Sequence, residues 1–558
     1  MSEVGRVNGQ RSPSSEPIRA DDPIKFDTDV LVLGGGPAGA WAAYGAASRG
    51  ARVTLVDKGY LGSSGATAPG GNNVLYVEPD QKLRDEAVAS RMAQGGYLSE
   101  ARWIHRILDN VYEQLKLVEQ WGYPFPKDEY GNSQRSHLQG PEYMKLMRNV
   151  VKKAGVRILD QSPALELLVD SHGVGGARGV SRLEGLPWEI RASAVVIATG
   201  GCAFLAGGLG CNVLTGEGLL MAAELGAELS GMEFARHYAP SAGGGTVTRG
   251  RTLGWGTFSR EDGTVVDRRG DPDALARALL DGPVYAVLDK ADTPEKRRIL
   301  RGAHAIFFLP LDRAGFDPFT QRFPVTLRYE GTVRGVGGIR ITGDDCSTTI
   351  PGLYAAGDAA SRQLVTGASS GGGAFNAAWA LSSGGWSGEA AAQYALSLGR
   401  KPHERTLQAA GRAGVQSAST GSASIETAAV IKAVQSEVFP LEINYFRSVP
   451  VLEQSLRRLN ALWPAVNGAP GTSADELLRS REAAAMVQTA RWSHTAALAR
   501  TETRGMHTFA EYPDTDPRQQ RRLTTAGVET IRVRPEGLAP ASAHPEPHPI
   551  SWRKAVAA

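Results

Sequence analysis

Cysteine is scarce in this sequence, which has Cys202, Cys211 and Cys346 as its only 3 cysteines among 558 residues. They are too few and too scattered for a disulfide framework or an iron–sulfur cluster, so we expect a reducing compartment, the cytoplasm, and no metal site. Charge of one sign is scarce as well, since the formal net charge is +3 and no long run of like charges occurs. Nucleic acid and acidic membrane surfaces are therefore disfavoured as partners.

Long apolar runs are also absent. The stretch from Val30 to Ala47 is apolar enough to imitate a membrane span, but turn-forming residues around Gly35 and Pro37 interrupt it. The first 22 residues mix Ser, Pro, Gly, Arg and acids, and they contain no apolar segment of a secretory signal. The sequence therefore predicts no membrane insertion. With 42% apolar and 21% charged residues, it suits a globular protein of about two or three domains.

A dinucleotide-binding motif stands near the start of the chain. Residues 29–33 predict a buried strand, 40–49 a helix and 51–56 a second strand, and the glycine-rich turn between the first strand and the helix has the pattern G-x-G-x-x-G. In this pattern Gly34 permits the tight turn, Gly36 lets the backbone approach a pyrophosphate, and Gly39 lets helix and strand pack closely. Asp57 would accept hydrogen bonds from the adenosine ribose. The alternative is a glycine-rich turn in an unrelated sheet, but strand, turn, helix and acid in register favour the dinucleotide site.

The rest of the chain predicts an α/β fold with a Rossmann-like domain, an inserted α+β domain and a C-terminal helical domain. Further central strands are expected at 194–201 and 352–358, and helices at 426–438, 451–462 and 474–499. The predicted boundaries are a disordered N-terminal tail over 1–26, the dinucleotide-binding domain over 27–235 and 343–415, the inserted domain over 236–342, the helical domain over 416–525, and a tail or arm over 526–558.

Six ordered motifs carry a family resemblance. They are the glycine turn with the following run Ser63 to Gly71, residues 198–201, Thr215 to Gly218, Gly231 to Phe234, Pro351 to Asp358, and Arg500 to His507 continuing to Pro513. In these places the sequence resembles the succinate dehydrogenase and fumarate reductase flavoprotein family, which also includes L-aspartate oxidase and the adenylylsulfate reductase flavoprotein. The resemblance spans residues from about 28 to 520 and implies that the dinucleotide is FAD and that the inserted domain is a capping domain.

The resemblance also implies which residues hold FAD. Ser63, Ser64, Gly70 and Gly71 would line its diphosphate and isoalloxazine. Asp358 would meet the ribitol or pyrophosphate, and the amides that open the helix after the glycine run at 371–373 would face the pyrimidine carbonyl, unless this run is a simple helix entry. The full predicted set is Gly34, Gly36, Pro37, Ala38, Gly39, Asp57, Lys58, Ser63, Ser64, Gly70, Gly71, Ala198, Thr199, Gly200, Asp358, Gly373, Ala374 and Phe375.

The chain departs from this family at three positions. Ser64 stands where succinate dehydrogenases carry the histidine that links the flavin covalently, so we expect non-covalent FAD. Ser370 replaces an arginine that clamps a C4 dicarboxylate, and Val333 replaces a histidine that binds the same substrates. Succinate, fumarate and L-aspartate are therefore not the expected substrates.

Four residues are candidates for substrate binding or proton transfer. Arg277 resembles the catalytic arginine of the capping domain, but it can equally be an exposed helix arginine. His237 and Tyr238 lie where relatives present a substrate-binding histidine, and a packing role is the alternative. Arg334 is a candidate contact for an anionic substrate, against the alternative of a surface arginine.

The function that the sequence predicts is an FAD-dependent oxidoreductase, namely a dehydrogenase, a reductase or an oxidase. A hydride would pass between flavin N5 and a small polar or anionic substrate. Two alternatives stay open. One is a flavoprotein subunit that passes electrons to a separate iron–sulfur protein, and the other is a flavin-binding protein without turnover.

Overall fold

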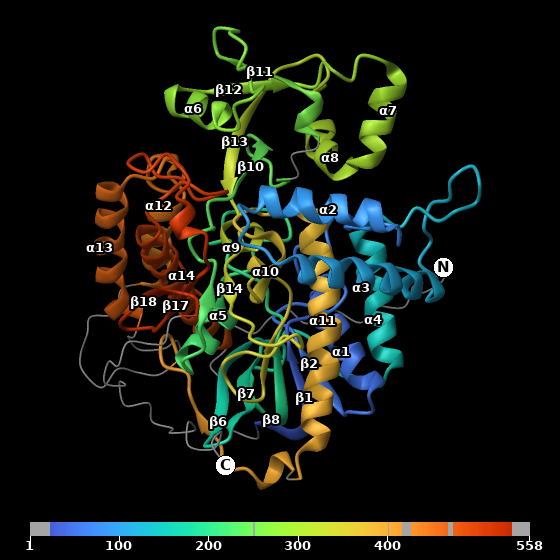
Figure 1. Ribbon diagram of the computed structural model, residues 1–558, viewed down its shortest axis with the longest axis vertical. Coiled ribbons are helices and arrows are strands. Elements are labelled where there is room, and N and C mark those ends of the chain that lie inside the picture. The colour runs from blue at the N-terminus through green and yellow to red at the C-terminus, as the bar shows by residue number, and fades with distance from the viewer. Residues whose placement is uncertain (1–22, 249–251, 400, 416–425, 467–472, 538–558) are drawn as a thin grey trace, which may run out of the picture.

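The computed structural model describes residues 23–248, 252–399, 401–415, 426–466 and 473–537. Its centre is an eight-stranded sheet in the order β16-β6-β7-β8-β1-β2-β5, with β15 pairing β8 off this path (Figure 1). The strands are β1 (Ile24–Leu33), β2 (Val53–Val56), β5 (Arg157–Leu159), β6 (Ala164–Asp170), β7 (Gly173–Ser181), β8 (Leu186–Ile197), β15 (Leu353–Ala355) and β16 (Gln408–Ala409). The predicted α/β class is confirmed.

The middle of this sheet is parallel and covered by helices. β1 pairs in parallel with β2 and with β8, and its apolar run Val30 to Leu33 is fully buried, as expected for a strand enclosed on both faces. α1 (Pro37–Ser48) packs tightly against α11 (Gly372–Ser397), because a Cβ at Gly388 would lie only 2.1 Å from the carbonyl oxygen of Ala42. The other elements of this region are β3 (Gly71–Asn73), β4 (His137–Gln139), α2 (Gln81–Gln94), α3 (Ala101–Gln120), α4 (Gly140–Lys153), α5 (Glu217–Glu224), α9 (Gly331–Arg334) and α10 (Gln363–Thr366).

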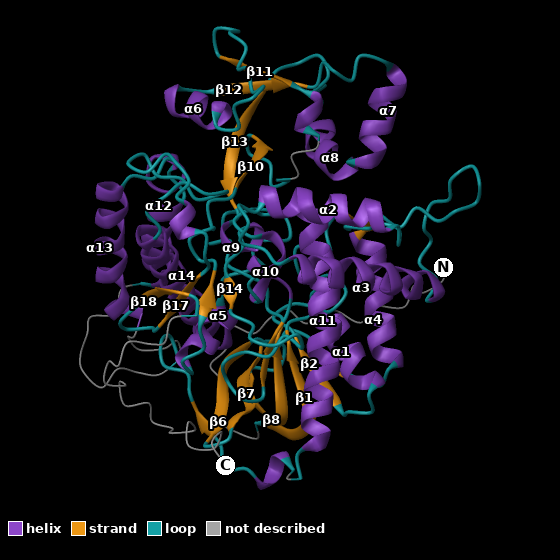
Figure 2. Cartoon of the chain, viewed as in Figure 1, coloured by secondary structure: helices purple, strands orange, loops and turns teal. Residues whose placement is uncertain are grey.

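The inserted segment forms a separate lobe with its own core. Its antiparallel sheet has the order β10-β13-β12-β11 and stands above the central sheet in Figure 2. Phe258, Phe307 and Phe323 are buried together in this lobe. Its elements are β10 (Tyr238–Ala242), β11 (Thr257–Arg260), α6 (Ala274–Asp281), β12 (Val284–Val287), α7 (Pro294–Ala303), α8 (Ala305–Arg313) and β13 (Phe323–Tyr329). The lobe is called the cap below.

A small sheet joins both ends of the cap to the end of the described chain. Its order is β14-β9-β17-β18, where β9 (Leu229–Ser230) precedes the cap and β14 (Gly338–Ile339) follows it. β17 (Leu523–Ala526) pairs with β9 and with β18 (Arg532–Pro535). The tail or arm predicted from residue 526 therefore contributes a strand up to Pro535, while 538–558 lie outside the described residues.

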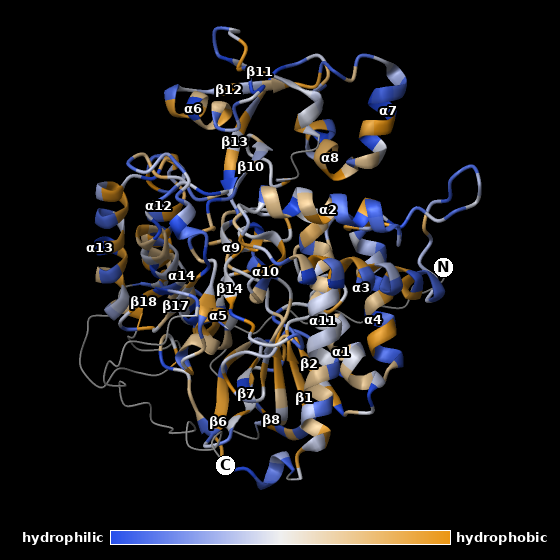
Figure 3. Ribbon diagram, in the orientation of Figure 1, coloured by the Kyte–Doolittle hydropathy of each residue, from blue (hydrophilic) through white to orange (hydrophobic). Residues whose placement is uncertain are grey.

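The C-terminal helices occupy the segments where the sequence predicted them. They are α12 (Thr427–Val438), α13 (Val449–Val466) and α14 (Ala474–Ala499). In Figure 3 the central strands are coloured as apolar, whereas the outward turns of helices such as α7 are hydrophilic. At the other end of the chain β1 begins at Ile24, inside the tail predicted for 1–26, and residues 1–22 are outside the described ranges. No helix within those ranges has the length and apolar composition to cross a membrane.

Candidate functional site

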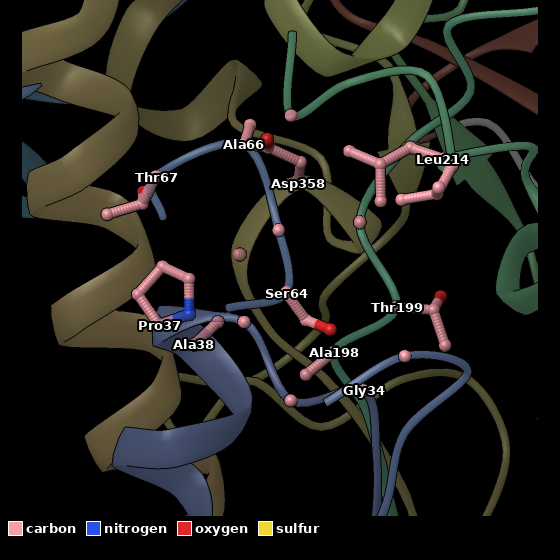
Figure 4. A pocket seen from close by; sticks show the side chains of 18 of the residues that line it. Gly34, Pro37, Ala38, Ser64, Ala66, Thr67, Ala198, Thr199, Leu214 and Asp358 are labelled. Carbon is pink, nitrogen blue, oxygen red and sulfur yellow. The ribbon is translucent and has the colours of Figure 1, made fainter. Parts of the chain in front are cut away.

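The segments that the sequence assigns to a cofactor come together where four strands end. β2 and β8 pair in parallel with β1, and β15 pairs in parallel with β8, so their carboxyl ends meet at one edge of the sheet. Ligands of α/β folds bind at such an edge. A cavity of about 440 Å³ opens there. Figure 4 shows Gly34 on one side of it and Ala66 and Asp358 on the opposite side.

The glycine turn after β1 has the geometry that a pyrophosphate requires. Gly34 has a φ of +107°, and a Cβ on it would lie 2.4 Å from the carbonyl oxygen of Ala198. At Gly39 a Cβ would lie 1.8 Å from the carbonyl oxygen of Gly34, so the helix could not approach the strand with any larger residue. At Gly36 a Cβ would meet its nearest contact, Gly65 Cα, at 3.8 Å, and Gly36 is the N-cap of α1 without a side chain that caps the helix. The first amides of α1 are therefore available to an anionic group.

Asp57 follows β2 and is surrounded by hydrogen-bond donors. Its carboxylate accepts hydrogen bonds from the amides of Gly35 at 2.5 Å and Gly59 at 2.7 Å, and from Ser64 Oγ at 2.5 Å. Burial raises the pKa of Asp57, and these hydrogen bonds oppose that rise. Ser64 thus lies at the carboxylate that is expected to hold the ribose, and its hydroxyl is occupied there.

Lys58 is neutralised by the chain itself. Its Nζ donates hydrogen bonds to Thr215 Oγ1 at 3.0 Å, Glu217 Oε1 at 2.7 Å and Glu482 Oε1 at 3.0 Å. Burial lowers the pKa of Lys58, but the two carboxylates outweigh this effect and raise it. Lys58 lines the cavity, yet its charge is committed to α5 and α14 rather than free for a phosphate.

Several buried polar atoms of the cavity wall have no partner. Among the described residues these include Thr199 Oγ1 and both amide atoms of Asn376. Buried polar groups are costly unless they are hydrogen-bonded, so a polar ligand is expected to satisfy them. Together with the glycine cradle and Asp57, they fit a dinucleotide. Asn376 was not among the predicted site residues, although it directly follows Phe375, which was.

Most of the predicted cofactor residues line the cavity. They are Gly34, Gly36, Pro37, Ala38, Asp57, Lys58, Ser63, Ser64, Ala198, Thr199, Gly200, Asp358 and Gly373. Five others do not: Gly39, Gly70, Gly71, Ala374 and Phe375. Gly71 faces the His137 ring, the carbonyl of Ala374 accepts a hydrogen bond from the Leu75 amide, and Phe375 packs under the Arg91 guanidinium.

Arg334 lies where the cavity meets the cap. It is the last residue of α9 and lines the cavity, and its Nη1 is 3.4 Å from the place of a Cβ at Gly373, in the first turn of α11. Its ion-pair partner is Glu330, whose Oε2 is 3.9 Å from the Arg334 Nε. Burial lowers the pKa of Arg334, but Glu330, Cys211 and Asp358 together outweigh this effect and raise it, so the guanidinium stays charged.

Glu330 connects Arg334 to the cap. It is buried, accepts a hydrogen bond from Thr248 Oγ1 at 2.7 Å, and its Oε2 lies 3.3 Å from Nε2 of His237. Burial raises the pKa of Glu330, but His237, Arg334 and Thr248 together outweigh this effect and lower the pKa. No sequence motif marked Glu330, because its partners are far apart in the chain. His237 itself does not line the cavity.

Two other predicted residues lie away from the cavity. Arg277 is on α6 in the cap, is about half exposed, and forms an ion pair with Asp271. The Tyr238 hydroxyl donates a hydrogen bond to the carbonyl of Val438 at 2.6 Å, and its ring is buried against Tyr329. The structure thus places Arg334 in the cavity wall. His237 lies outside the wall, on the same Glu330 carboxylate as Arg334, and Arg277 and Tyr238 have other partners.

Known families and relatives match this chain along most of its length. A model described as an FAD binding domain matches residues 29–270, and one described as fumarate reductase flavoprotein C-term matches residues 437–546. A subunit of the fumarate reductase (CoM/CoB) of Methanothermobacter marburgensis is 26% identical over 546 residues, which cover 89% of this chain and 97% of that protein. An L-aspartate oxidase of Mycobacterium bovis is 27% identical over 545 residues, covering 90% and 95% of the two chains.

Solved structures share the fold over nearly the whole chain. The FrdA chain of E. coli quinol fumarate reductase superimposes with a TM-score of 0.76 at 21% identity, covering 93% of this chain and 98% of that one. Adenylylsulfate reductase from Archaeoglobus fulgidus gives a TM-score of 0.75 at 18% identity, covering 96% and 99%. At these identities the likeness shows a common fold.

Proposed function

Because the chain belongs to the succinate dehydrogenase and fumarate reductase flavoprotein family, we propose that it oxidises or reduces a small anionic substrate that Arg334 holds between the FAD cavity and the cap. The observation that supports this proposal is the position of Arg334, a partly buried, charged guanidinium in the cavity wall whose ion-pair carboxylate is 3.9 Å away. A planar guanidinium in that state is well suited to bind an anionic group.

The predicted FAD cofactor is confirmed, and the chain is an FAD-dependent oxidoreductase. We infer that the α1 amides and Gly36 hold the diphosphate, that Asp57 holds the ribose, and that Thr199 and Asn376 satisfy their unpaired atoms on the cofactor. When bound, FAD supplies the acceptor or donor of a hydride. No histidine or cysteine occurs among the described residues that line the cavity, which supports non-covalent FAD. Acid precipitation should therefore release all flavin, and flavin retained on the polypeptide would contradict this.

The pair of His237 and Glu330 can move a proton close to the bound anion. The His237 Nε2 and Glu330 Oε2 atoms are within 3.3 Å, and Arg334 lies on the other side of the same carboxylate. Imidazole and carboxylate groups both serve as general acids and bases in enzymes, so this pair can hold or release a proton during turnover. Arg277 remains a candidate for this role only if the cap moves, since in this structure it is paired with Asp271 at the surface.

We propose that C4 dicarboxylates are poor substrates, although the relatives include proteins named fumarate reductase and L-aspartate oxidase. Ser370 offers one neutral hydroxyl, which is buried without a partner. Val333 is buried in an apolar cluster with Ala203, Cys211 and Leu214. Replacing an arginine and a histidine by these residues removes about 3–5 kcal/mol of binding to a second carboxylate, or about a hundredfold or more in turnover efficiency.

An anaerobic screen tests both proposals. The FAD-loaded protein is mixed with candidate reductants, including succinate and L-aspartate, and the visible flavin band is followed, while fumarate is assayed with a reduced artificial carrier. We expect bleaching by an anionic reductant outside the C4 dicarboxylates. Turnover of succinate, fumarate or L-aspartate at tens per second with a sub-millimolar KM would contradict the proposed substrate class. If neither arm of the screen shows any substrate-dependent change of the flavin, the chain is a binding protein without turnover.

A second candidate function is that of an electron-transferring subunit. The matched protein of Methanothermobacter marburgensis is itself named as one subunit of a fumarate reductase. We propose that a separate iron–sulfur protein can reoxidise this chain, because its own 3 cysteines, all buried, are too few to hold a four-cysteine cluster. None of these cysteines forms a disulfide, which supports a cytoplasmic location. After anaerobic bleaching, slow recovery in air would favour the electron-transferring role, and rapid recovery would favour an oxidase.

A further inference from the structure

A second arginine, beside the first turn of α11, has no hydrogen-bond or ion-pair partner among the described residues. Arg91 on α2 is only 9% exposed, and its Nε is buried without an acceptor. Within the described residues its guanidinium makes no hydrogen bond or ion pair. Burial alone lowers its pKa, without a charged neighbour that opposes the effect. The Phe375 ring stabilises one face of the guanidinium, but within the described residues no acceptor or counter-charge satisfies the N–H groups at its edge.

Arg91 lies at the start of α11, below the cap. Its guanidinium carbon is 3.9 Å from the centre of the Phe375 ring. The residue after α2 contacts the segment that precedes α11, because the Ala368 amide donates a hydrogen bond of 2.9 Å to the carbonyl of Gly95. In Figure 1, α2 crosses the upper end of α11 just beneath the cap. The same segment, just before α11, contains Ser370, whose hydroxyl is also buried and has no hydrogen-bond partner among the described residues.

Two guanidinium groups therefore flank the first turn of α11. Arg334 approaches it at Gly373, and Arg91 approaches it at Phe375. The helix is 26 residues long, and its N-cap Gly371 provides no side-chain hydrogen bond to the first amides. A helix N-terminus carries positive potential, which adds to the two charges. The two guanidinium groups, the uncapped amides of α11 and the unpaired Ser370 hydroxyl together favour an anionic ligand at this turn.

We propose that Arg91 binds an anionic group of the substrate at the start of α11, in place of the arginine that position 370 lacks. This inference rests on the function proposed above. Arg91 reaches the turn from α2, whereas a side chain at position 370 would reach it from within the turn itself. The bound group is therefore displaced toward α2, which is why an enzyme with Arg91 can accept an anionic substrate and still bind C4 dicarboxylates poorly.

Arg84 provides a matched control on the same helix. It stands seven positions before Arg91, so both lie on one face of α2, and it is equally buried at 9% exposure. Unlike Arg91, it has partners, since it forms an ion pair with Asp109 and its Nε donates a hydrogen bond to the carbonyl of Glu78 at 3.1 Å. Arg84 is thus a structural arginine, and the two residues differ mainly in whether the chain satisfies them.

The test uses the FAD-loaded protein and three simple anions, namely acetate, malonate and sulfate, at constant ionic strength. Their binding is followed by the change in the flavin absorption spectrum and by the rise in Tm. We expect at least one anion to bind the wild type and Arg91→Met to weaken it tenfold or more, with unchanged FAD affinity. Arg91→Lys should recover part of the loss. Without anion, the Tm of Arg91→Met should equal or exceed that of the wild type, because an unpaired buried charge has been removed.

The controls separate a failure of this inference from a failure of the proposed function. Arg84→Met should lower the Tm and leave the anion affinity within twofold. If Arg91→Met behaves in the same way while Arg334→Met loses the anion, Arg91 is structural and the proposed function stands. If no anion changes the spectrum or Tm of the wild type, both are overturned.

Discussion

Lys58 and Arg334 are the two cations among the described residues that line the cavity, and their surroundings differ. Lys58 donates hydrogen bonds to two carboxylates and a hydroxyl, all within 3.0 Å. Arg334 has a single ion-pair carboxylate at 3.9 Å. The charge at Lys58 is neutralised before any ligand binds, whereas the charge at Arg334 remains available. The charge of Lys58 therefore stabilises the fold, and we expect the charge of Arg334 to act on a ligand.

The same contrast holds for the neighbouring polar groups. Near Lys58, the Asp57 carboxylate already accepts three hydrogen bonds from the chain. Near Arg334, Asn376 and Ser370 have buried polar atoms without partners among the described residues. Substitutions at the first end should mainly change stability or FAD affinity, and substitutions at the second should mainly change the response to anions.

The largest effect is expected for Lys58→Met. The substitution leaves the buried carboxylates of Glu217 and Glu482 without their shared cation, which costs about 3–5 kcal/mol of stability. The Tm, measured by calorimetry, should fall by several degrees. Lys296→Met is the control, because Lys296 forms an exposed pair with Asp292 that contributes only about 0–1 kcal/mol. Equal Tm values for the two variants would show that the Lys58 cluster is not structural.

Next in size is Arg334→Met. It should lower the rate of flavin bleaching by the best anionic reductant about a hundredfold, or by about 2.7 kcal/mol, while the protein still binds FAD. Stopped-flow absorbance under anaerobic conditions measures this. Arg277→Met should change the rate less than about threefold, since Arg277 is half exposed and paired with Asp271. A large loss at Arg277 together with a small one at Arg334 would reverse our assignment of the two arginines.

Asp57→Ala should act on FAD rather than on the substrate. Removing a charge-assisted hydrogen bond to the ribose costs about 1.5–3 kcal/mol of FAD affinity, and the spectrum of the flavin that remains bound should not change. Fluorescence titration of the apoprotein with FAD gives the affinity. Asp160→Asn is a control nearby, since Asp160 pairs with Arg148 and does not line the cavity. Unchanged affinity in Asp57→Ala would mean that another acid holds the ribose.

The smallest effect concerns Glu330 and depends on pH. Its pKa is lowered in the folded protein, so its ionised form stabilises the fold above its unfolded pKa of about 4.3, and this contribution is lost as the pH falls through the folded pKa. Glu330→Gln should therefore have a lower Tm than the wild type at about pH 7, and the difference should shrink below about pH 4. Glu113→Gln, in an exposed pair with Lys116, should show little difference at either pH. A constant difference for Glu330→Gln across this range would refute the lowered pKa.

Sequence alone could predict the parts of the site that are local. The first strand, the glycine turn, the helix and Asp57 follow one another in the chain, so periodicity and spacing are sufficient to place them. The contacts between Lys58 and Glu482 join residues 424 positions apart, and no pattern in either segment indicates them. Glu330 and Arg91 were missed for the same reason, since their significance depends on which groups surround them in space.

Short elements were beyond prediction for another reason. β9 and β14 are each 2 residues long, too short for any alternation of apolar and polar residues to be detected. They form only because distant strands are present to pair with them. The prediction of a tail or arm from residue 526 rested on composition alone. Composition does not show strand pairing, so it could not indicate that Arg532–Pro535 adds a strand to this sheet.

This small sheet also constrains the order in which the protein can assemble during translation. β9 is synthesised just before the cap and β14 just after it, but β17, the other neighbour of β9, emerges from the ribosome only with residues 523–526. Until then one edge of β9 has no partner, and exposed strand edges are prone to wrong pairing. The base of the cap therefore stays incomplete for the whole time that the helical domain is being made, and a chain truncated before residue 523 would lack the strand that completes it.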